Sequence, residues 1–312
     1  MIQQLIQPVA INNHTSSPFH QVTQTRFASA KDVFVSSAYR VHFGKLSKAQ
    51  ELLGEKILIL TGNGGKKQFF GEALGMQGPV LNTNVQWAFL TGGEEIDTVM
   101  GAVEETGKTF VENATLKAQA GHDFYNAQNE NVSVLGEDFG IVLTSPKVQE
   151  FYEETLKKVD PECPGIAGVY SKRWVTPKVY KYLTGEDLPK KPNDYHRNKA
   201  VVALLDNLDL KGEERNAEFS SAFVVITPSG KRYIAEGQEP VLIVEGEAAD
   251  AALAISEKAG FGFGYIAHPI TELGVLKNSS AALTPTENLQ YNTRAKALAS
   301  LKQKIEADLN SK

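Results

Sequence analysis

Three groups of residues in this sequence could together bind and cleave a phosphate compound. A glycine-rich turn, residues 61–65, is followed directly by Lys66. Glu112 lies near the start of a helical pattern, and Glu137 and Asp138 follow an apolar run. Phosphate esters need their charge neutralised, commonly by Mg²⁺ held on a few carboxylates, and an acid near the metal can activate water. These residue types therefore indicate metal-assisted phosphate chemistry.

The glycine-rich turn joins an expected strand to an expected helix. Four consecutive aliphatic residues at 57–60 predict a buried strand, and the apolar positions within 69–74 predict a helix. A turn between such elements can direct backbone N–H groups and the positive end of the helix dipole toward one anion. This turn consists of Thr61, Gly62, Asn63, Gly64 and Gly65. The spacing to Lys66 is not that of the Walker phosphate loop, so an ordinary strand-to-helix turn remains an equal alternative.

The acidic residues are expected on elements that bring them to one edge of a sheet. Thr109 is followed three residues later by Glu112, a capping box that predicts the start of a helix. The cap explains Glu112 without a metal, although the two roles can coexist. Residues 132–136 predict a strand with Glu137 and Asp138 at its carboxyl end, where α/β sheets place their ligands.

The remaining patterns predict an α/β chain with additions. Further strands are expected at 33–35, 218–226, 231–236 and 241–247, and further helices at 47–53, 146–159, 195–208 and 294–309. Residues 75–107 carry few periodic signals and suit an excursion or a lid better than core. We expect residues 1–54 to be an N-terminal extension and 55–312 the main domain, with insertions near 76–104, 144–162 and 176–195.

Composition and charge restrict the partners and the compartment. A chain of 312 residues with 42% hydrophobic and 22% charged residues is ordinary for a globular protein. Its net charge of -5 argues against nucleic-acid and membrane partners, so an anionic substrate must be bound by local cations. Cys163 is the only cysteine, which excludes an internal disulfide. With no apolar run of membrane-spanning length and no signal-peptide pattern, we expect a cytoplasmic protein.

Five ordered motifs give the chain a resemblance to a known family. They are Thr61–Lys66, Glu105–Ala114, Glu137–Gly140, Pro164–Arg173 and Gly262–Tyr265. In this order they resemble the inosine triphosphate pyrophosphatase family, also called Ham1-like, over residues 56 to 305 with interruptions. The resemblance implies an α/β fold with a long central mixed sheet, two lobes and an active-site cleft between them. It also implies homodimers, Mg²⁺, and hydrolysis of a nucleoside triphosphate to monophosphate and pyrophosphate, typically with inosine or xanthosine as the base.

The resemblance also carries residue roles over to this chain. It implies that Glu112 and Asp138 hold Mg²⁺ and that Asp138 is the base for the attacking water. It implies catalytic roles for Asp138, Glu137 and Lys66. It implies contact with the substrate for the cradle residues Thr61, Gly62, Asn63, Gly64, Gly65 and Lys66, and for Lys117, Arg173, Phe263, Gly264, Tyr265 and Arg294.

The chain departs from the family pattern where the family surrounds the base and sugar. Ile266 stands in the position of an aspartate, Asn288 in that of a lysine, and Thr293 in that of a histidine, whereas Arg294 is retained. Phe139 replaces the small residue that commonly follows the second acid. Buried polar groups that discriminate between bases are therefore missing, and we expect no strong preference for inosine triphosphate.

Three readings of the sequence stay open at this point. The first is an active Mg²⁺-dependent pyrophosphatase with a rebuilt base pocket, which the retained acids favour. The second is a catalytically degenerate family member that binds a nucleotide or a protein, which the lost lysine and histidine favour. The third is an unrelated α/β protein with coincidental motifs, which five motifs in order disfavour. A panel of nucleoside triphosphates assayed for pyrophosphate release would discriminate between them.

Overall fold

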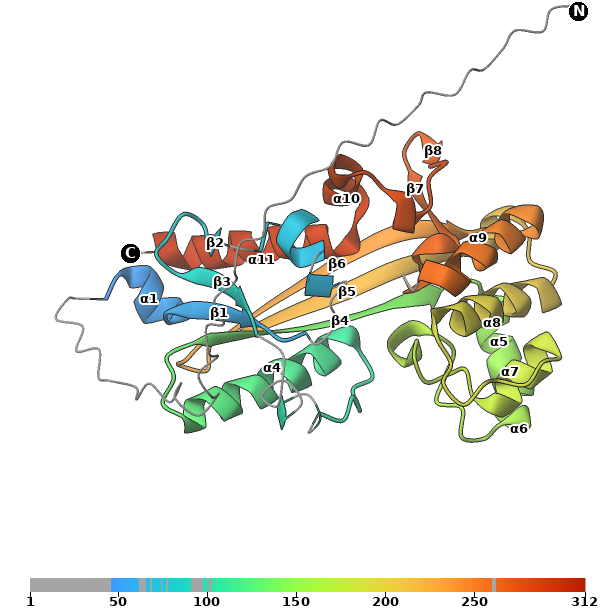
Figure 1. Ribbon diagram of the computed structural model, residues 1–312, viewed down its shortest axis with the longest axis horizontal. Coiled ribbons are helices and arrows are strands. Elements are labelled where there is room, and N and C mark those ends of the chain that lie inside the picture. Colours follow the sequence, from blue (N-terminus) through green and yellow to red (C-terminus); the bar gives the residue numbers. More distant parts are fainter. Residues whose placement is uncertain are drawn as a thin grey trace, which may run out of the picture. The chain divides into compact units, whose positions relative to one another are not determined.

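A mixed β-sheet forms the framework of the protein, as the computed structural model shows (Figure 1). The structure describes residues 46–61, 66–67, 69–73, 75–76, 78–90, 98–99, 101, 103–259 and 262–311. Within these residues the strands are β1 (Lys56–Ile59), β2 (Gly78–Pro79), β3 (Gln86–Phe89), β4 (Ser133–Leu143), β5 (Asn216–Ile226), β6 (Arg232–Ile243), β7 (Ala267–Thr271) and β8 (Gly274–Val275). They are ordered β2-β3-β1-β4-β5-β6-β7-β8 across the sheet. This arrangement confirms the expected mixed sheet.

Parallel and antiparallel strands meet at β4. On one side β4 runs parallel to β1, which in turn runs parallel to β3, and on the other side β4, β5, β6 and β7 are antiparallel. The long pairing of β5 with β6 confirms the predicted hairpin. The strand predicted at 241–247 is only the end of β6, because Val241 continues the same ladder opposite Ala217.

Helices cover the two faces of this sheet. In Figure 1, α4 (Phe110–Ala127) lies along one face and α11 (Thr293–Asn310) along the other. A separate group of helices packs against the far end of β4 and β5 and forms a second lobe around the buried Trp174 and Tyr180. This lobe contains α5 (Pro146–Phe151), η2 (Tyr152–Leu156), α6 (Lys157–Val159), η3 (Gly168–Tyr170), α7 (Pro177–Thr184), α8 (Asp194–Asn207), η4 (Gly212–Arg215), α9 (Gly246–Ala259) and η5 (Gly262–Tyr265). The remaining helices are α1 (Lys48–Leu53), η1 (Phe69–Ala73), η6 (Ser280–Ala282) and α10 (Pro285–Tyr291).

Two stretches that the sequence placed outside the core are part of it. Residues 78–90, expected in an excursion, supply β2 and β3, and Trp87 is 4% exposed in the core beneath α11. Residues 47–53, expected in the extension, form α1, whose Leu53 is fully buried in the same core. The compact unit accordingly begins at Leu46 rather than at 55. The strand expected at 33–35 lies outside the described residues.

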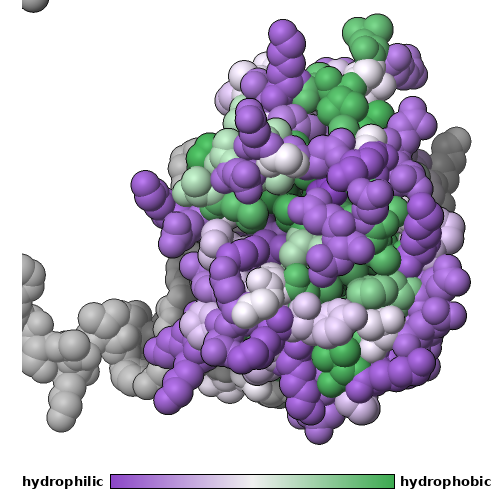
Figure 2. Space-filling view, turned by 90° about the vertical axis from the view of Figure 1, so that its right-hand side faces the viewer, coloured by the Kyte–Doolittle hydropathy of each residue, from purple (hydrophilic) through white to green (hydrophobic). Residues whose placement is uncertain are grey.

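The surface gives no sign of a membrane-spanning segment in the described part of the chain. None of the described helices is long and apolar enough to cross a bilayer. Figure 2 views the end that carries the second lobe, where hydrophilic side chains predominate and apolar ones are scattered. Tyr182 and Ile255 are exposed apolar residues of this lobe. Isolated exposed apolar residues of this kind are normal for a protein surface.

Two glycines let the covering helices approach the sheet closely. A Cβ at Gly136 of β4 would lie 2.2 Å from the carbonyl oxygen of Ala114 in α4. A Cβ at Gly237 of β6 would lie 2.0 Å from the carbonyl oxygen of Thr293 in α11. Both distances are far below any van der Waals contact, so each helix rests on backbone that lacks a side chain. The positions of α4 and α11 therefore depend on these two residues.

We expect Gly136→Ala to destabilise the protein by about 1–3 kcal/mol, the usual scale for overpacking, because α4 must move off β4. The free energy of unfolding from urea titration measures the effect. Gly101→Ala is the matched control, since a Cβ there would meet no atom of the described chain within 4 Å. Its effect should stay within about 0.5 kcal/mol. Equal effects of the two substitutions would contradict the close approach.

Candidate functional site

The two adjacent acids lie in the middle of β4, not at its carboxyl end as predicted. Glu137 is opposite Phe223 of β5, and Asp138 is opposite Ala222. In the described chain β4 pairs with β1 only over Ser133–Leu135. In the sheet, Glu137 and Asp138 therefore lie just beyond the carboxyl end of the neighbouring strand β1. In the sequence, the glycine-rich turn follows this end of β1. The parallel half of the sheet, rather than β4 itself, supplies the expected strand end.

Asp138 faces α4, because side chains alternate between the two faces of a strand. Its Oδ1 accepts a hydrogen bond from Lys117 Nζ at 2.8 Å, and its Oδ2 accepts one from Asn113 Nδ2 at 3.2 Å. Lys117 and Asn113 are both buried on α4. Two donors from one helix therefore fix the orientation of the Asp138 carboxylate.

Lys117 connects a second carboxylate to this site. Its Nζ lies 3.0 Å from Glu105 Oε1 and also donates to the backbone oxygen of Glu137 at 3.1 Å. Burial alone would lower the pKa of Lys117, but Asp138 and Glu105 outweigh it and raise that pKa, so the ammonium stays charged. Burial raises the pKa of Asp138, and the charge of Lys117 offsets only part of this. A carboxylate with a raised pKa is better suited to accept a proton near neutral pH.

Glu137 faces α11 and contacts two cations. Lys66 Nζ donates to its Oε2 at 2.5 Å, and Arg294 Nε donates to its Oε1 at 2.7 Å. Burial would raise the pKa of Glu137, but the charges of Lys66 and Arg294 hold it well below the ordinary range. Burial lowers the pKa of Lys66, and Glu137 offsets only part of that effect. The adjacent acids thus form two buried ion-pair clusters on opposite faces of the sheet.

An aromatic ring supports the Arg294 cluster. The guanidinium carbon of Arg294 lies 4.1 Å from the ring centroid of Phe139 and 5.9 Å from that of Phe69. Stacking of this kind on an aromatic face stabilises a guanidinium and restricts its orientation. Phe139, in the sequence only a departure from the family pattern, is therefore part of the site.

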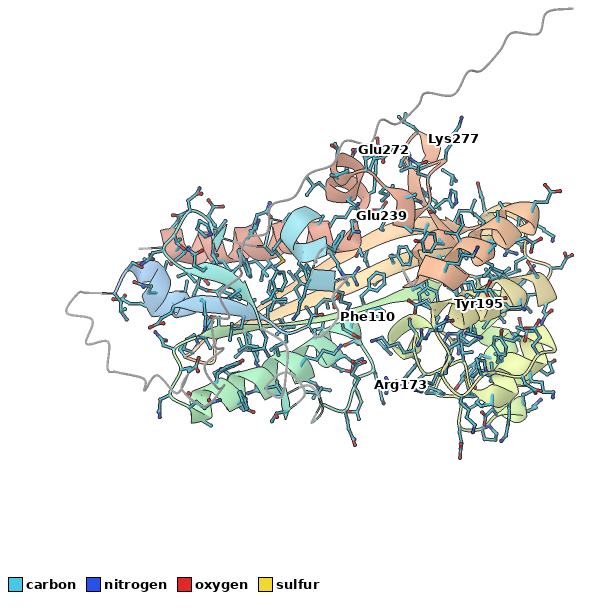
Figure 3. The ribbon with its side chains drawn as sticks, in the orientation of Figure 1. Phe110, Arg173, Tyr195, Glu239, Glu272 and Lys277 are labelled. Carbon is cyan, nitrogen blue, oxygen red and sulfur yellow. The ribbon has the colours of Figure 1, made fainter. Side chains whose placement is uncertain are left out.

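Further cations act on these clusters from the loop after η3. Burial would raise the pKa of Glu105, but Lys117, and to a smaller extent Lys172 and Arg173, lower it. The charge of Lys172 also lowers the pKa of Lys66. Figure 3 shows Arg173 on the side of the sheet that carries Phe110, the first residue of α4. Arg173 also lies 5.6 Å from the ring centroid of Tyr170.

Glu112 forms the capping box that the sequence predicts. Its Oε2 accepts hydrogen bonds from the backbone N–H groups of Lys108 at 2.6 Å and Thr109 at 3.1 Å, and Thr109 Oγ1 accepts from Glu112 N. The cap uses one carboxylate oxygen. Asn113, the next residue, contacts Asp138, so this helix start adjoins the acid. The role of Glu112 as a metal ligand stays a prediction.

The carboxylates near Asp138 could bind Mg²⁺ only together with oxygens of a bound phosphate. No group of three or more His, Cys, Asp or Glu side chains in the described chain is arranged to hold a metal by itself. Mg²⁺ is usually held by one or two carboxylates together with substrate phosphates and water. Asp138 and Glu105 converge on the single ammonium of Lys117, at 2.8 and 3.0 Å. Oxygen ligands of the right type are therefore present at this point.

The other residues that were predicted to contact the substrate do not all lie at this site. Gly62, Asn63, Gly64 and Gly65 lie outside the described residues, whereas Thr61 is buried at the end of β1. Phe263, Gly264 and Tyr265 belong to η5, which contacts α8, α9 and β7 in the second lobe. The structure thus places Lys117 with Asp138 on one face of β4 and Lys66 and Arg294 with Glu137 on the other. The η5 residues lie on another element.

The residues that replace the family's polar groups are engaged within the fold. Ile266 is fully buried in the lobe core. Thr293 Oγ1 donates to the backbone oxygen of Gly237 and lies 3.1 Å from Ser221 Oγ. Asn288 Nδ2 donates to Leu283 O at 3.2 Å. These groups serve packing and hydrogen bonds between elements of the protein itself.

Sequence reasoning gave no role to Glu105, Asn113, Phe139 or Lys172. Glu105 and Asn113 belong to the motif Glu105–Ala114, and Lys172 belongs to the motif Pro164–Arg173. The one available signal was spacing on α4: positions 113 and 117 are four apart and so share a helix face. Such spacing does not reveal which strand residue the face meets.

Comparisons with known proteins show similarity to one family in sequence and in fold. Residues 162–304 match the Ham1 family. A dITP/XTP pyrophosphatase of Thermus thermophilus is 29% identical over 251 residues, 80% of this chain and 91% of that protein. A dITP/XTP pyrophosphatase of Corynebacterium glutamicum is 27% identical over 201 residues, 64% of this chain and 76% of that protein. The solved structure of a HAM1 protein from Coxiella burnetii superposes with a TM-score of 0.52 at 20% identity, covering 81% and 98% of the two chains.

The fold and site define a mixed α/β protein with paired carboxylate and cation clusters on its central strand. The comparisons show that this chain is similar to proteins of the Ham1, inosine triphosphate pyrophosphatase-like, family.

The Glu137 cluster predicts a pH-dependent contribution to stability. A carboxyl whose pKa falls on folding stabilises the protein fully above its ordinary value, about 4.3, and loses this contribution as the pH falls through the lowered pKa. At pH 7, Glu137→Gln should reduce the free energy of unfolding by about 3–5 kcal/mol, because it leaves buried cations uncompensated. Below about pH 4.3 the difference from wild type should shrink.

Urea unfolding between pH 7 and pH 3 measures this difference. The control is Glu186→Gln, since Glu186 pairs with Lys199 at 2.7 Å but its side chain is 57% exposed. Its effect should stay below about 1 kcal/mol at every pH. A pH-independent penalty for Glu137→Gln would show that folding does not lower the pKa of this carboxyl.

Proposed function

We propose that this protein is a Mg²⁺-dependent nucleoside triphosphate pyrophosphatase, which hydrolyses a nucleoside triphosphate to a monophosphate and pyrophosphate. The observation that carries the proposal is the position of Asp138. It lies just beyond the end of β1 and is oriented by Lys117 and Asn113. The neighbouring Glu137 binds Lys66 and Arg294, and the charges of Lys172 and Arg173 act on Glu105, which shares Lys117 with Asp138. In a chain of net charge -5, such a concentration of cations indicates an anionic substrate. Two relatives that are named as dITP/XTP pyrophosphatases support the same activity.

In the proposed reaction, Asp138 accepts a proton from the attacking water. The water oxygen forms a bond to the α-phosphorus, and the bond from that phosphorus to the bridging oxygen breaks, so that pyrophosphate leaves with the electron pair. Lys117 and Asn113 hold Asp138 in the orientation that removes this proton. Lys66 and Arg173 neutralise phosphate charge that grows on the leaving group. Each residue does what its position and charge allow without rearrangement of the sheet.

The proposed cofactor is Mg²⁺, held by Asp138 with Glu112 or Glu105 and by phosphate oxygens. When bound, it would neutralise phosphate charge and polarise the phosphorus. We also propose a homodimer, as the family resemblance suggests, and a location in the cytoplasm, for which the single cysteine of the chain speaks. The alternative is a catalytically degenerate member that binds nucleotide or protein, which the engaged replacements Ile266, Asn288 and Thr293 favour. The presence or absence of pyrophosphate release separates the two.

The central test of this activity is Asp138→Asn. The amide keeps the size of the side chain but cannot accept the proton, so the rate of pyrophosphate release should fall by at least about a hundredfold. Asp160→Asn is the matched control, because Asp160 is 4% exposed but lies in the second lobe, where it caps Glu162 N at 3.3 Å. Both proteins are assayed with Mg²⁺ and the same triphosphates. Unchanged release in Asp138→Asn would remove Asp138 from the reaction.

We further propose that the base pocket discriminates weakly. The side chain of Ile266 can form no hydrogen bond, and the side chains of Asn288 and Thr293 already donate to the backbone oxygens of Leu283 and Gly237. In such a pocket, a mismatched base leaves no buried polar group of the protein unpaired. The free energies with which the pocket binds the different bases should therefore differ little. The expected kcat/KM values for inosine, xanthosine, adenosine and guanosine triphosphates lie within about a hundredfold of one another. A larger preference for inosine or xanthosine would show that other residues read the base.

A further inference from the structure

Glu137 has an arrangement that a catalytic acid does not need. Its side chain is 4% exposed, and each carboxylate oxygen binds a different cation: Oε2 binds Lys66 and Oε1 binds Arg294. These cations come from distant parts of the chain, the segment after β1 and the first turn of α11. Glu137 is therefore the point at which the two segments are joined electrostatically.

The position of Glu137 separates it from the proposed proton transfer. Asp138 faces α4 and Glu137 faces α11, so their carboxylates extend from opposite faces of one strand. The contact between the two sites is the backbone oxygen of Glu137, which Lys117 binds at 3.1 Å. The Glu137 side chain instead lies between two cations, Lys66 of the predicted phosphate cradle and Arg294 of α11.

Lys66 and Arg294 would repel each other without an anion between them, since like charges in a poorly solvated site interact strongly. The charge of Arg294 does lower the pKa of Lys66. The ring centroid of Phe139 lies 4.1 Å from the guanidinium carbon of Arg294, and this stacking restricts movement of the guanidinium. A carboxylate at Glu137 allows both cations to stay together when no phosphate is bound. It also cancels part of the charge they present to a phosphate.

We infer that Glu137 is an internal counter-anion that competes with phosphate for Lys66 and Arg294 and so promotes release of the pyrophosphate product. Phosphate and carboxylate oxygens accept the same charge-assisted hydrogen bonds from lysine and arginine. When a triphosphate binds, Lys66 moves part of its interaction from Glu137 to phosphate. When the product dissociates, Glu137 takes that interaction back. The inference deepens the proposed function and rests on it.

The first test is binding of pyrophosphate to the full chain by calorimetry, without nucleotide. Glu137→Gln keeps a carbonyl acceptor but removes the competing charge, so pyrophosphate should bind about tenfold more tightly or better. Glu239→Gln is the matched control (Figure 3), because Glu239 is also buried and pairs with a cation of α11, Lys296. Its affinity should stay within about twofold of wild type. Equal or weaker binding in Glu137→Gln overturns the inference.

A second variant covers the case in which Glu137→Gln fails to fold. Glu137→Asp keeps the charge and withdraws the carboxylate by one methylene, which loosens its hold on Lys66. Pyrophosphate should then bind several-fold more tightly than in wild type. An unchanged affinity in a folded Glu137→Asp protein also overturns the inference.

Steady-state kinetics separates this inference from the proposed function. If product release is retarded, the Glu137 variants should lower KM and kcat together, with a matching decrease in the inhibition constant of pyrophosphate. A kcat/KM that falls along with kcat while KM and pyrophosphate affinity are unchanged would make Glu137 a catalytic group and overturn the inference. If wild type hydrolyses no triphosphate although Glu137→Gln binds pyrophosphate more tightly, the proposed function fails while the competition between anions stands.

Discussion

The alternation of side chains along β4 is the constraint on which the site depends. Two adjacent acids on one strand must face opposite sides of the sheet, so Glu137 and Asp138 cannot share a cation. Each instead requires its own partners, because an uncompensated buried carboxylate is costly. Lys117 on α4 and Arg294 on α11 meet this requirement from the two faces. The strand thus determines where each helix must carry its charge.

The close approach of the helices follows from the same requirement. A lysine or arginine can form short ion pairs with a strand acid only if its helix is near the sheet. Gly136 lies beneath α4 at Ala118, the residue after Lys117, and Gly237 lies beneath α11 at Thr293, the residue before Arg294. Each glycine is therefore adjacent to the charge that it serves. Packing and electrostatics are coupled at this level, and neither helix can shift without weakening an ion pair.

Much of the fold was predictable from the sequence, and the site only in part. Local patterns predicted the β5–β6 hairpin, the start of α4 at Thr109 and the long α11, since turns, caps and periodicity are encoded in neighbouring residues. They failed for β3, whose burial of Trp87 depends on pairing with β1, and for the position of the acids within β4. They also could not show that Lys66 and Arg294, far apart in the chain, meet at one carboxylate. Contacts between distant segments leave no local signal.

The replacements around the base position have a structural meaning beyond loss of polar groups. Phe139, in place of a small residue, stacks on Arg294 and packs against Phe219 with ring centroids 5.3 Å apart. Thr293, in place of a histidine, binds the backbone at Gly237, where α11 touches β6. Both changes strengthen the attachment of α11 to the sheet and thereby fix Arg294 on Glu137. In this chain the start of α11 therefore positions the guanidinium of Arg294 between Glu137 and the ring of Phe139.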